Sequence, residues 1–124
     1  MTETRPWPEE IRLAKDKRTL SVRFKTGEAF DYPAEYLRVA SPSAEVQGHS
    51  PDQRQTVPGK KNVEIMKIEP VGRYAVRLTF TDLHNTGIFS WDYLYELGTE
   101  YETRWAGYLA ELAEKGLSRE LKPR

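Results

Sequence analysis

Apolar side chains recur at every second position in two separate stretches of this 124-residue chain, and this period of two restricts the fold more than any other feature. The first stretch covers positions 10–32 and is broken by polar residues at 15–18 and 26–27, so it predicts a three-stranded meander. The second covers positions 63–80, and its clearest alternation is that of Tyr74, Val76, Leu78 and Phe80. The opposite face carries Arg73, Arg77 and Thr79, which indicates an antiparallel sheet with one face in water.

Turn signals set the ends of the second group of strands. Positions 69–72, with the sequence Glu-Pro-Val-Gly, are expected to form the turn between its first two strands. Positions 81–87 form a second turn, after which Ile88 and Phe89 make a short return strand.

Three segments depart from the period of two and predict helices. Pro33 stands at an expected first helical position, so residues 33–39 predict a short helix after the third strand. Ser90 is placed to cap a helix that begins at Trp91, and Gly98 is placed to end it in the left-handed conformation.

The last helix is predicted from Thr99 and Glu102, whose spacing is that of a capping box. Its apolar stripe, which we expect to pack on the sheet, consists of Trp105, Tyr108, Leu109 and Leu112. The predicted fold class is therefore α+β: a mostly antiparallel sheet of about five to six strands, a short helix after the third strand, and two C-terminal helices packed on the sheet.

Composition excludes several classes of protein. Lysine plus arginine and aspartate plus glutamate number 19 each, so no net field attracts nucleic acid or an anionic membrane surface. Apolar residues make up 38% of the chain, and we expect one domain over 1–124 with its core at about 8–115. Without a cysteine, an apolar leader or a membrane-spanning stretch, the chain is expected to be cytoplasmic.

Positions 41–62 are polar, rich in serine, proline, glycine and glutamine, and without a sustained period. A loop of this length inside a compact domain is usually functional or mobile. Arg54, Lys60 and Lys61 follow one another here without an acid between them, and we interpret them as part of a solvated loop.

The two histidines, His49 and His84, are the candidates for a metal or acid–base site. Both fall in predicted loops, where a solvated imidazole is the simpler interpretation, although Asp82 or Asp92 could orient the ring of His84. Glu45 precedes His49 by four positions, which a helix would bring to one face. The sequence has no nucleophile elbow, cysteine nucleophile or phosphate-binding glycine loop, so we expect no enzyme.

Six aromatic residues crowd positions 91–108, among several acidic ones. Helical spacing places most of these rings in the core, and those left exposed, with Trp91 as the first candidate, would be anchors for a protein partner. The neighbouring acids disfavour stacking on nucleic acid.

Three segments, 36–49, 70–76 and 80–94, together resemble the gamma-butyrobetaine hydroxylase-like N-terminal domain family in its short stand-alone bacterial form. They read YLRVASPSAEVQGH, PVGRYAV and FTDLHNTGIFSWDYL, and the resemblance extends over residues 8–112. In the hydroxylases this domain precedes a separate iron- and 2-oxoglutarate-dependent catalytic domain. The resemblance therefore implies a domain that lacks the hydroxylase site.

The relatives hold a structural zinc with three cysteines and one histidine, and the resemblance implies that these ligands correspond here to Ser41, Ser43, Val46 and His84. Because the three cysteines are missing, a zinc site of that kind should not form. The family is also similar to a domain appended to P-loop iron–sulfur carrier proteins, which implies a link to iron or cluster handling.

A zinc site in the relatives requires the 41–49 loop to lie against the 82–87 turn, so the polar groups of both segments should converge here. We predict a non-catalytic binding or accessory module linked to metal or iron–sulfur handling, with a protein partner, no nucleic acid, no membrane, and a monomeric or weakly dimeric state. Its predicted site consists of Arg38, Glu45, His49, Asp82, His84 and Trp91. Three alternatives stay open: a hydrogen-bonded strut without a ligand, a metal-binding protein that holds iron or zinc with His84 and His49 beside nearby carboxylates, and a small enzyme.

Overall fold

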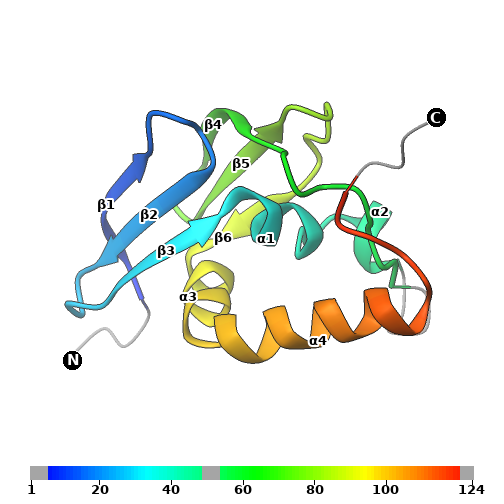
Figure 1. The fold of residues 1–124 in the computed structure, drawn as a ribbon. Coiled ribbons are helices and arrows are strands. Elements are labelled where there is room, and N and C mark those ends of the chain that lie inside the picture. The colour runs from blue at the N-terminus through cyan, green and yellow to red at the C-terminus, as the bar shows by residue number, and fades with distance from the viewer. Residues whose placement is uncertain (1–5, 49–53, 121–124) are drawn as a thin grey trace.

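The structure is a computed structural model that describes residues 6–48 and 54–120. Over these ranges the elements are, in chain order, β1 (Pro8–Leu13), β2 (Thr19–Phe24), β3 (Ala29–Pro33), α1 (Ala34–Val39), α2 (Ala44–Gln47), β4 (Ile65–Val71), β5 (Ala75–Phe80), β6 (Ile88–Ser90), α3 (Trp91–Thr99) and α4 (Tyr101–Glu114). The strands form two three-stranded antiparallel sheets, β1-β2-β3 and β4-β5-β6, and α3 and α4 lie along one side of them (Figure 1).

The prediction of one sheet with five to six strands is wrong, because the strands divide into two meanders. Each strand pairs with its neighbours in sequence, and the chain leaves the first sheet through α1 and a long loop before β4 begins. A period of two shows that a strand has a buried face, but it does not show which strand lies beside it. The two sheets still share one core, which includes Leu20, Val22, Phe24, Leu37, Ile65, Val76, Leu78, Phe80, Leu94 and Leu97.

Strand β4 continues through residues that were expected to form a turn. Pro70 pairs with Val76 in the ladder, and the turn lies at 72–74 instead. Proline has no backbone N–H, but it is tolerated here because β4 is an edge strand. As a result Tyr74, which was expected in the core, is 59% exposed, and Ala75 is buried in its place.

The short helix predicted after the third strand is confirmed as α1. It begins one residue later than expected, because Pro33, with φ −62° and ψ 141°, is its N-cap. Tyr36 of α1 donates its hydroxyl hydrogen to the carbonyl of Leu97 at 2.7 Å, and Tyr32 of β3 donates to the carbonyl of Leu94 at 2.6 Å. These buried hydrogen bonds fix α3 against β3 and α1.

Helix α3 starts as predicted but does not end as predicted. The hydroxyl oxygen of Ser90 accepts a hydrogen bond from the N–H of Tyr93 at 3.1 Å. The helix runs through Gly98, which is not in the left-handed region, to Thr99. A Cβ on Gly98 would lie 2.4 Å from the ring of Phe30, so this glycine permits close packing of α3 on the first sheet.

The capping box expected before α4 does not form. The N-cap of α4 is Glu100, which makes no side-chain cap, and the hydroxyl of Thr99 donates to the carbonyl of Glu96 at 3.0 Å. Of the predicted apolar stripe, Tyr108 is buried whereas Leu109 is exposed.

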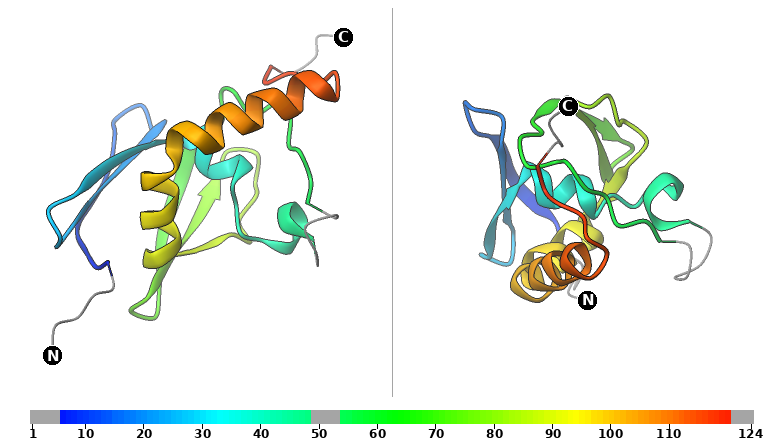
Figure 2. Two further views of the ribbon diagram at one scale, coloured as in Figure 1. Left: turned by 90° about the horizontal axis from the view of Figure 1, so that it is seen from below. Right: turned by 45° about the vertical axis from the view of Figure 1, so that its right-hand side comes forward.

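Helix α4 packs on α1 and on the 54–63 loop, which corrects the prediction that it packs on the sheet. The rings of Trp105 and Tyr36 meet with centroids 6.3 Å apart, and the hydroxyl of Tyr108 donates to the carbonyl of Val57 at 2.6 Å. Figure 2 shows α4 extending past α1 toward this loop.

The segment from 41 to 62 has more structure than its sequence predicted. It contains the single-turn helix α2, and its basic part is bonded to the C-terminal segment. Arg54 forms an ion pair with Glu111, and the N–H of Gly59 donates to the carbonyl of Ser118 at 2.9 Å. Arg54 and Lys61 are exposed, so the interpretation as a solvated loop holds for these two side chains, whereas it is wrong for Lys60, which pairs with Asp82.

Candidate functional site

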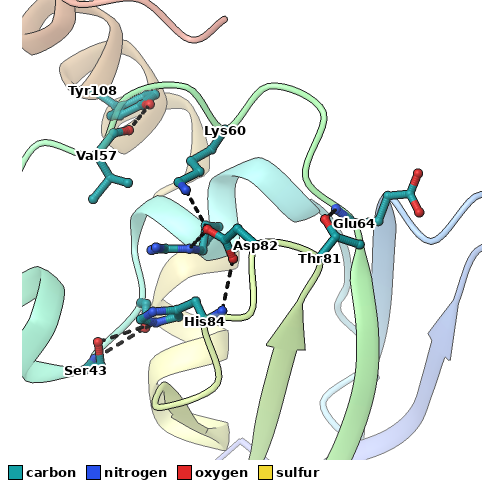
Figure 3. Close-up of polar contacts among 10 residues, drawn as sticks. Ser43, Val57, Lys60, Glu64, Thr81, Asp82, His84 and Tyr108 are labelled. Atoms are coloured by element: carbon teal, nitrogen blue, oxygen red, sulfur yellow. Dashed lines mark hydrogen bonds and ion pairs between the residues drawn. The ribbon is translucent and has the colours of Figure 1, made fainter. Parts of the chain in front are cut away.

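The turn that joins β5 to β6 is held tightly at its base. The N–H of Phe80 donates to the carbonyl of His84 at 3.0 Å, and the N–H of Leu83 donates to the carbonyl of Phe80 at 2.8 Å. The N–H of His84 also donates to the carboxylate of Asp82 at 3.1 Å (Figure 3). This closed geometry places Leu83 at φ +72°, a region that bulky side chains rarely adopt, and leaves it 76% exposed.

The carboxylate of Asp82 is shared by two cations. Nε of Arg38, on α1, lies 2.8 Å from Oδ2, and Nζ of Lys60 lies 2.6 Å from the same oxygen. The three side chains are only 11%, 22% and 21% exposed for Arg38, Lys60 and Asp82. Two positive charges therefore meet one negative charge in a partly buried position.

The ionisation of Asp82 reflects these neighbours. Burial raises the pKa of this carboxyl group, but the hydrogen bonds from Lys60, from Arg38 and from the N–H of His84 outweigh burial and hold the pKa at about 2. The guanidinium of Arg38 is incompletely paired, because its Nη1 is buried and has no hydrogen-bond partner among the described residues. Asp82 is thus an ionised anchor for the turn, and its pKa is too low for a general base near neutral pH.

The imidazole of His84 is buried and faces the segment that follows α1. Its Nε2 lies 3.5 Å from Oγ of Ser43 (Figure 3). The same nitrogen lies 2.9 Å from Oγ of Ser41. Gly87 approaches the same place, since a Cβ on it would lie 2.3 Å from Oγ of Ser41. The convergence that the family resemblance implied is therefore observed for these described residues.

The donor groups present do not fit the structural zinc that the resemblance implies. Ser41 and Ser43 offer neutral hydroxyls in place of thiolates, and Val46 offers no donor and is buried. Across residues 6–48 and 54–120, no group of three or more His, Cys, Asp or Glu side chains is placed to hold a metal ion. In this chain hydrogen bonds between His84 and the serines join the two segments.

The structure brings together only part of the predicted site. Arg38, Asp82 and His84 form one connected cluster. Trp91 lies elsewhere: its indole N–H donates to the carbonyl of Arg73 at 2.7 Å, and its ring packs edge-on against Trp7. His49 lies outside the described residues, and so does the side chain of Glu45, although its backbone belongs to α2.

Two features of the site were not recognised in the sequence. Lys60 is the second cation on Asp82, and the only sequence signal for it was a run of cations without an acid. Leu83 was treated as an ordinary turn residue, but it is both exposed and in the left-handed region. An apolar residue in the middle of a polar turn was the signal that could have identified it.

These observations define a small α+β domain in which a cluster of partly buried polar groups fixes one turn. A family model for gamma-butyrobetaine hydroxylase-like N-terminal domains matches residues 11–95, which is most of the chain. The protein belongs to this family.

Solved structures support this membership over the whole fold. One solution NMR structure is of a protein with 48% sequence identity, and the match has a TM-score of 0.83 over 97% of this chain and 94% of the other. A second has 41% identity and a TM-score of 0.81 over 100% and 98%. A crystal structure of a DUF971 family protein of unknown function from Acidithiobacillus ferrooxidans has 41% identity and a TM-score of 0.62 over 73% and 91%.

No curated protein matches the chain. Within the described ranges, none of the helices combines the length and apolar character needed to cross a lipid bilayer.

Proposed function

We propose that this protein is a non-catalytic binding module that docks on a protein partner through the 81–87 turn, with Leu83 as the apolar anchor. The observation that carries the proposal is the conformation of Leu83, which is 76% exposed at φ +72°. A left-handed conformation costs about 1–2 kcal/mol for an L-residue, and an exposed side chain recovers little of it by burial. Asparagine or glycine would fit the same backbone with less strain.

The polar groups around this turn support binding over catalysis. Asp82 is neutralised by Arg38 and Lys60, and the imidazole of His84 is in contact with Ser41 and Ser43. These groups point inward and hold the turn, whereas Leu83 points outward. A rigid turn that presents one apolar side chain loses little conformational entropy when it binds.

The test compares partner capture by Leu83→Gly and by the wild-type protein. Glycine relieves the backbone strain, so we expect the unfolding free energy of the variant to rise by about 0.5–1 kcal/mol and its Tm by about 2–4 °C. Proteins cross-linked to the immobilised wild-type protein in a bacterial lysate are identified by mass spectrometry, and the Kd of the leading partner is then measured with purified protein. We expect Leu83→Gly to weaken that Kd at least about tenfold, as for an interface hot spot.

Met66→Asp is the matched control, because Met66 is also an exposed apolar residue but lies on β4. It should keep the affinity of the wild-type protein. Equal affinity of Leu83→Gly and the wild-type protein would rule out the turn as the docking surface. A Tm of Leu83→Gly at or above that of the wild-type protein would show that unfolding does not explain a loss of binding in that variant.

The link to metal or iron–sulfur handling and the lack of enzymatic activity stay predictions, and the first of them is supported by the family resemblance alone. Elemental analysis of the untagged protein, purified without chelator, tests the link directly. Stoichiometric iron or zinc that is lost in His84→Ala would favour a metal-binding function over a pure docking module.

A further inference from the structure

A hollow of about 290 Å³ lies beside the Asp82 cluster, between the 59–63 loop, the start of the turn and the C-terminal segment. Figure 3 shows two of its residues, Lys60 and Asp82, in contact. The residues that matter for its chemistry are Lys60, Lys61, Asn62, Thr81, Asp82 and Arg119. We call it the Lys61 hollow.

Positive charge exceeds negative charge around the Lys61 hollow. The charge of Arg119 is balanced by Glu35, because the guanidinium donates two hydrogen bonds to this buried carboxylate. Asp82 neutralises only one of the two cations that contact it, Arg38 and Lys60. Lys61 forms no ion pair in the described part of the chain, so positive charge is in surplus here, and the nearby carboxylate of Glu120, which acts on Arg119, offsets only part of it.

Several hydrogen-bond donors at the Lys61 hollow are not fully used by the described residues. The side chains of Lys61 and Asn62 are exposed and make no hydrogen bond with any other described residue. The ammonium group of Lys60 has three donors, of which Asp82 uses one. The hydroxyl of Thr81 accepts from the N–H of Glu64 at 3.0 Å, so its own hydrogen is available to a ligand.

The backbone around the Lys61 hollow is already ordered. The N–H of Gly59 donates to the carbonyl of Ser118 at 2.9 Å, and the N–H of Lys61 donates to the carbonyl of Arg119 at 2.9 Å. A further hydrogen bond of 3.1 Å runs from the N–H of Val63 to the carbonyl of Lys60. Binding here needs little rearrangement, which lowers its entropic cost.

We propose that the Lys61 hollow binds one anionic group of the size of a phosphate or a carboxylate. Surplus positive charge in a partly buried hollow with unused N–H donors is the arrangement that charge-assisted hydrogen bonds to such groups require. A polyanion such as nucleic acid fits less well, because the chain as a whole has a formal net charge of +0. The hollow shares Thr81 and Asp82 with the 81–87 turn but does not include Leu83, so phosphate binding can be tested whether or not the turn docks on a protein.

The experiment titrates the whole protein with inorganic phosphate at constant ionic strength, and follows the backbone amide signals of Lys61, Asn62 and Thr81 by NMR. Sodium chloride at the same ionic strength is the reference. We expect saturable shifts with phosphate but not with chloride. Lys61→Gln should weaken phosphate binding about fivefold, and because Lys61 is exposed and unpaired among the described residues, its Tm should not change.

Asp82→Asn should change the affinity for phosphate in the opposite direction. Removing this carboxylate releases both Arg38 and Lys60, so phosphate should bind about threefold or more tightly, although the variant is less stable. Lys67→Gln is the matched control, since Lys67 is exposed on β4 and pairs with Glu69, and it should leave the affinity unchanged.

Parallel titrations with acetate and with O-phosphoserine identify the source of the anionic group. Preference for the phosphorylated compound indicates a phosphate monoester as the ligand, and equal binding of acetate indicates a carboxylate. Shifts that do not saturate, or an affinity that is the same in Lys61→Gln, Asp82→Asn and Lys67→Gln, would overturn the proposal.

Discussion

The guanidinium of Arg119 donates two hydrogen bonds to the carboxylate of Glu35, at 2.9 and 2.7 Å, across 84 positions of sequence. Glu35 is buried on α1, so this bidentate pair attaches the C-terminal segment to the first helix. The guanidinium also lies 5.3 Å from the ring of Trp105. Together with the backbone hydrogen bonds from Gly59 to Ser118 and from Lys61 to Arg119, the pair holds the segment after α4 near the site.

Breaking this pair should destabilise the fold. Arg119→Ala leaves the carboxylate of Glu35 buried without its partner, and we expect a loss of about 2–3 kcal/mol in the free energy of unfolding measured with urea. Adding Glu35→Gln to that variant should recover about 1 kcal/mol, because the uncompensated charge is removed. Additive losses in the double variant would show that the two residues do not interact in solution.

Two glycines in the C-terminal helices should respond to alanine in opposite directions. A Cβ on Gly98 would lie 2.4 Å from the ring of Phe30, so Gly98→Ala should destabilise the fold by about 1–3 kcal/mol. A Cβ on Gly107 would meet nothing within 4 Å, and alanine favours the helix interior, so Gly107→Ala should stabilise it by about 0.5–1 kcal/mol. The Tm of each variant, measured by thermal unfolding, shows whether its stability falls or rises. A Gly98→Ala variant more stable than the wild-type protein would contradict the packing of α3 on Phe30.

The ion pairs of Asp82 should make stability depend on pH in a defined window. The pKa of this carboxyl group is lowered from 3.8 to about 2 in the folded state, so its contribution is fully present above about pH 4 and is lost as the pH falls toward 2. Solvent screening reduces this contribution to about 1 kcal/mol. We expect wild type and Asp82→Asn to differ by a constant amount from pH 4 to 6, and to converge between pH 4 and 2 in urea titrations. If the unfolding free energies of the two proteins still differed by the same amount at pH 2, Asp82 would stabilise the fold by an interaction that does not depend on its charge.

Three cysteines should convert the hydrogen-bonded cluster into a metal site. The resemblance implies ligand positions at Ser41, Ser43 and Val46, and the structure places both serine hydroxyls beside Nε2 of His84. A variant with all three changed to cysteine should bind one zinc ion, measured by elemental analysis and by cobalt substitution spectra. Adding His84→Ala should weaken this binding strongly. A triple variant that purifies without zinc, and takes none up, would show that position 46 does not face the cluster.

The local pattern of the sequence predicted the elements well and their assembly less well. The alternation of Val76, Leu78 and Phe80 correctly indicated a buried strand face, and Ser90 correctly indicated a helix start. A buried strand face and a helix start are determined mainly by residues that are close in sequence, so a sequence pattern can predict them. Whether the two meanders join edge to edge into one sheet depends on contacts between segments far apart in the sequence, on which a period of two carries no information.

The site was predicted only where family resemblance linked two segments. Arg38, Asp82 and His84 lie within the recognised motifs and do converge. Lys60 and Asp82 are 22 positions apart, and neither residue belongs to a periodic element. The sequence pattern therefore did not predict their ion pair. The exposure of Leu83 could have been suspected from an apolar residue in a polar turn, but its left-handed backbone conformation accompanies hydrogen bonds that close the turn and does not follow from residue type.

The edge position of β4 has a consequence for the behaviour of the protein at high concentration. Pro70 supplies no backbone donor, a β-bulge interrupts the ladder between Ile65 and Lys67, and the charges of Lys67 and Glu69 lie on the same strand. Each of these features discourages a second copy of the strand from adding to an open sheet edge. This side of the second sheet is therefore protected against fibril growth, and crowded solutions of the protein should not assemble through it.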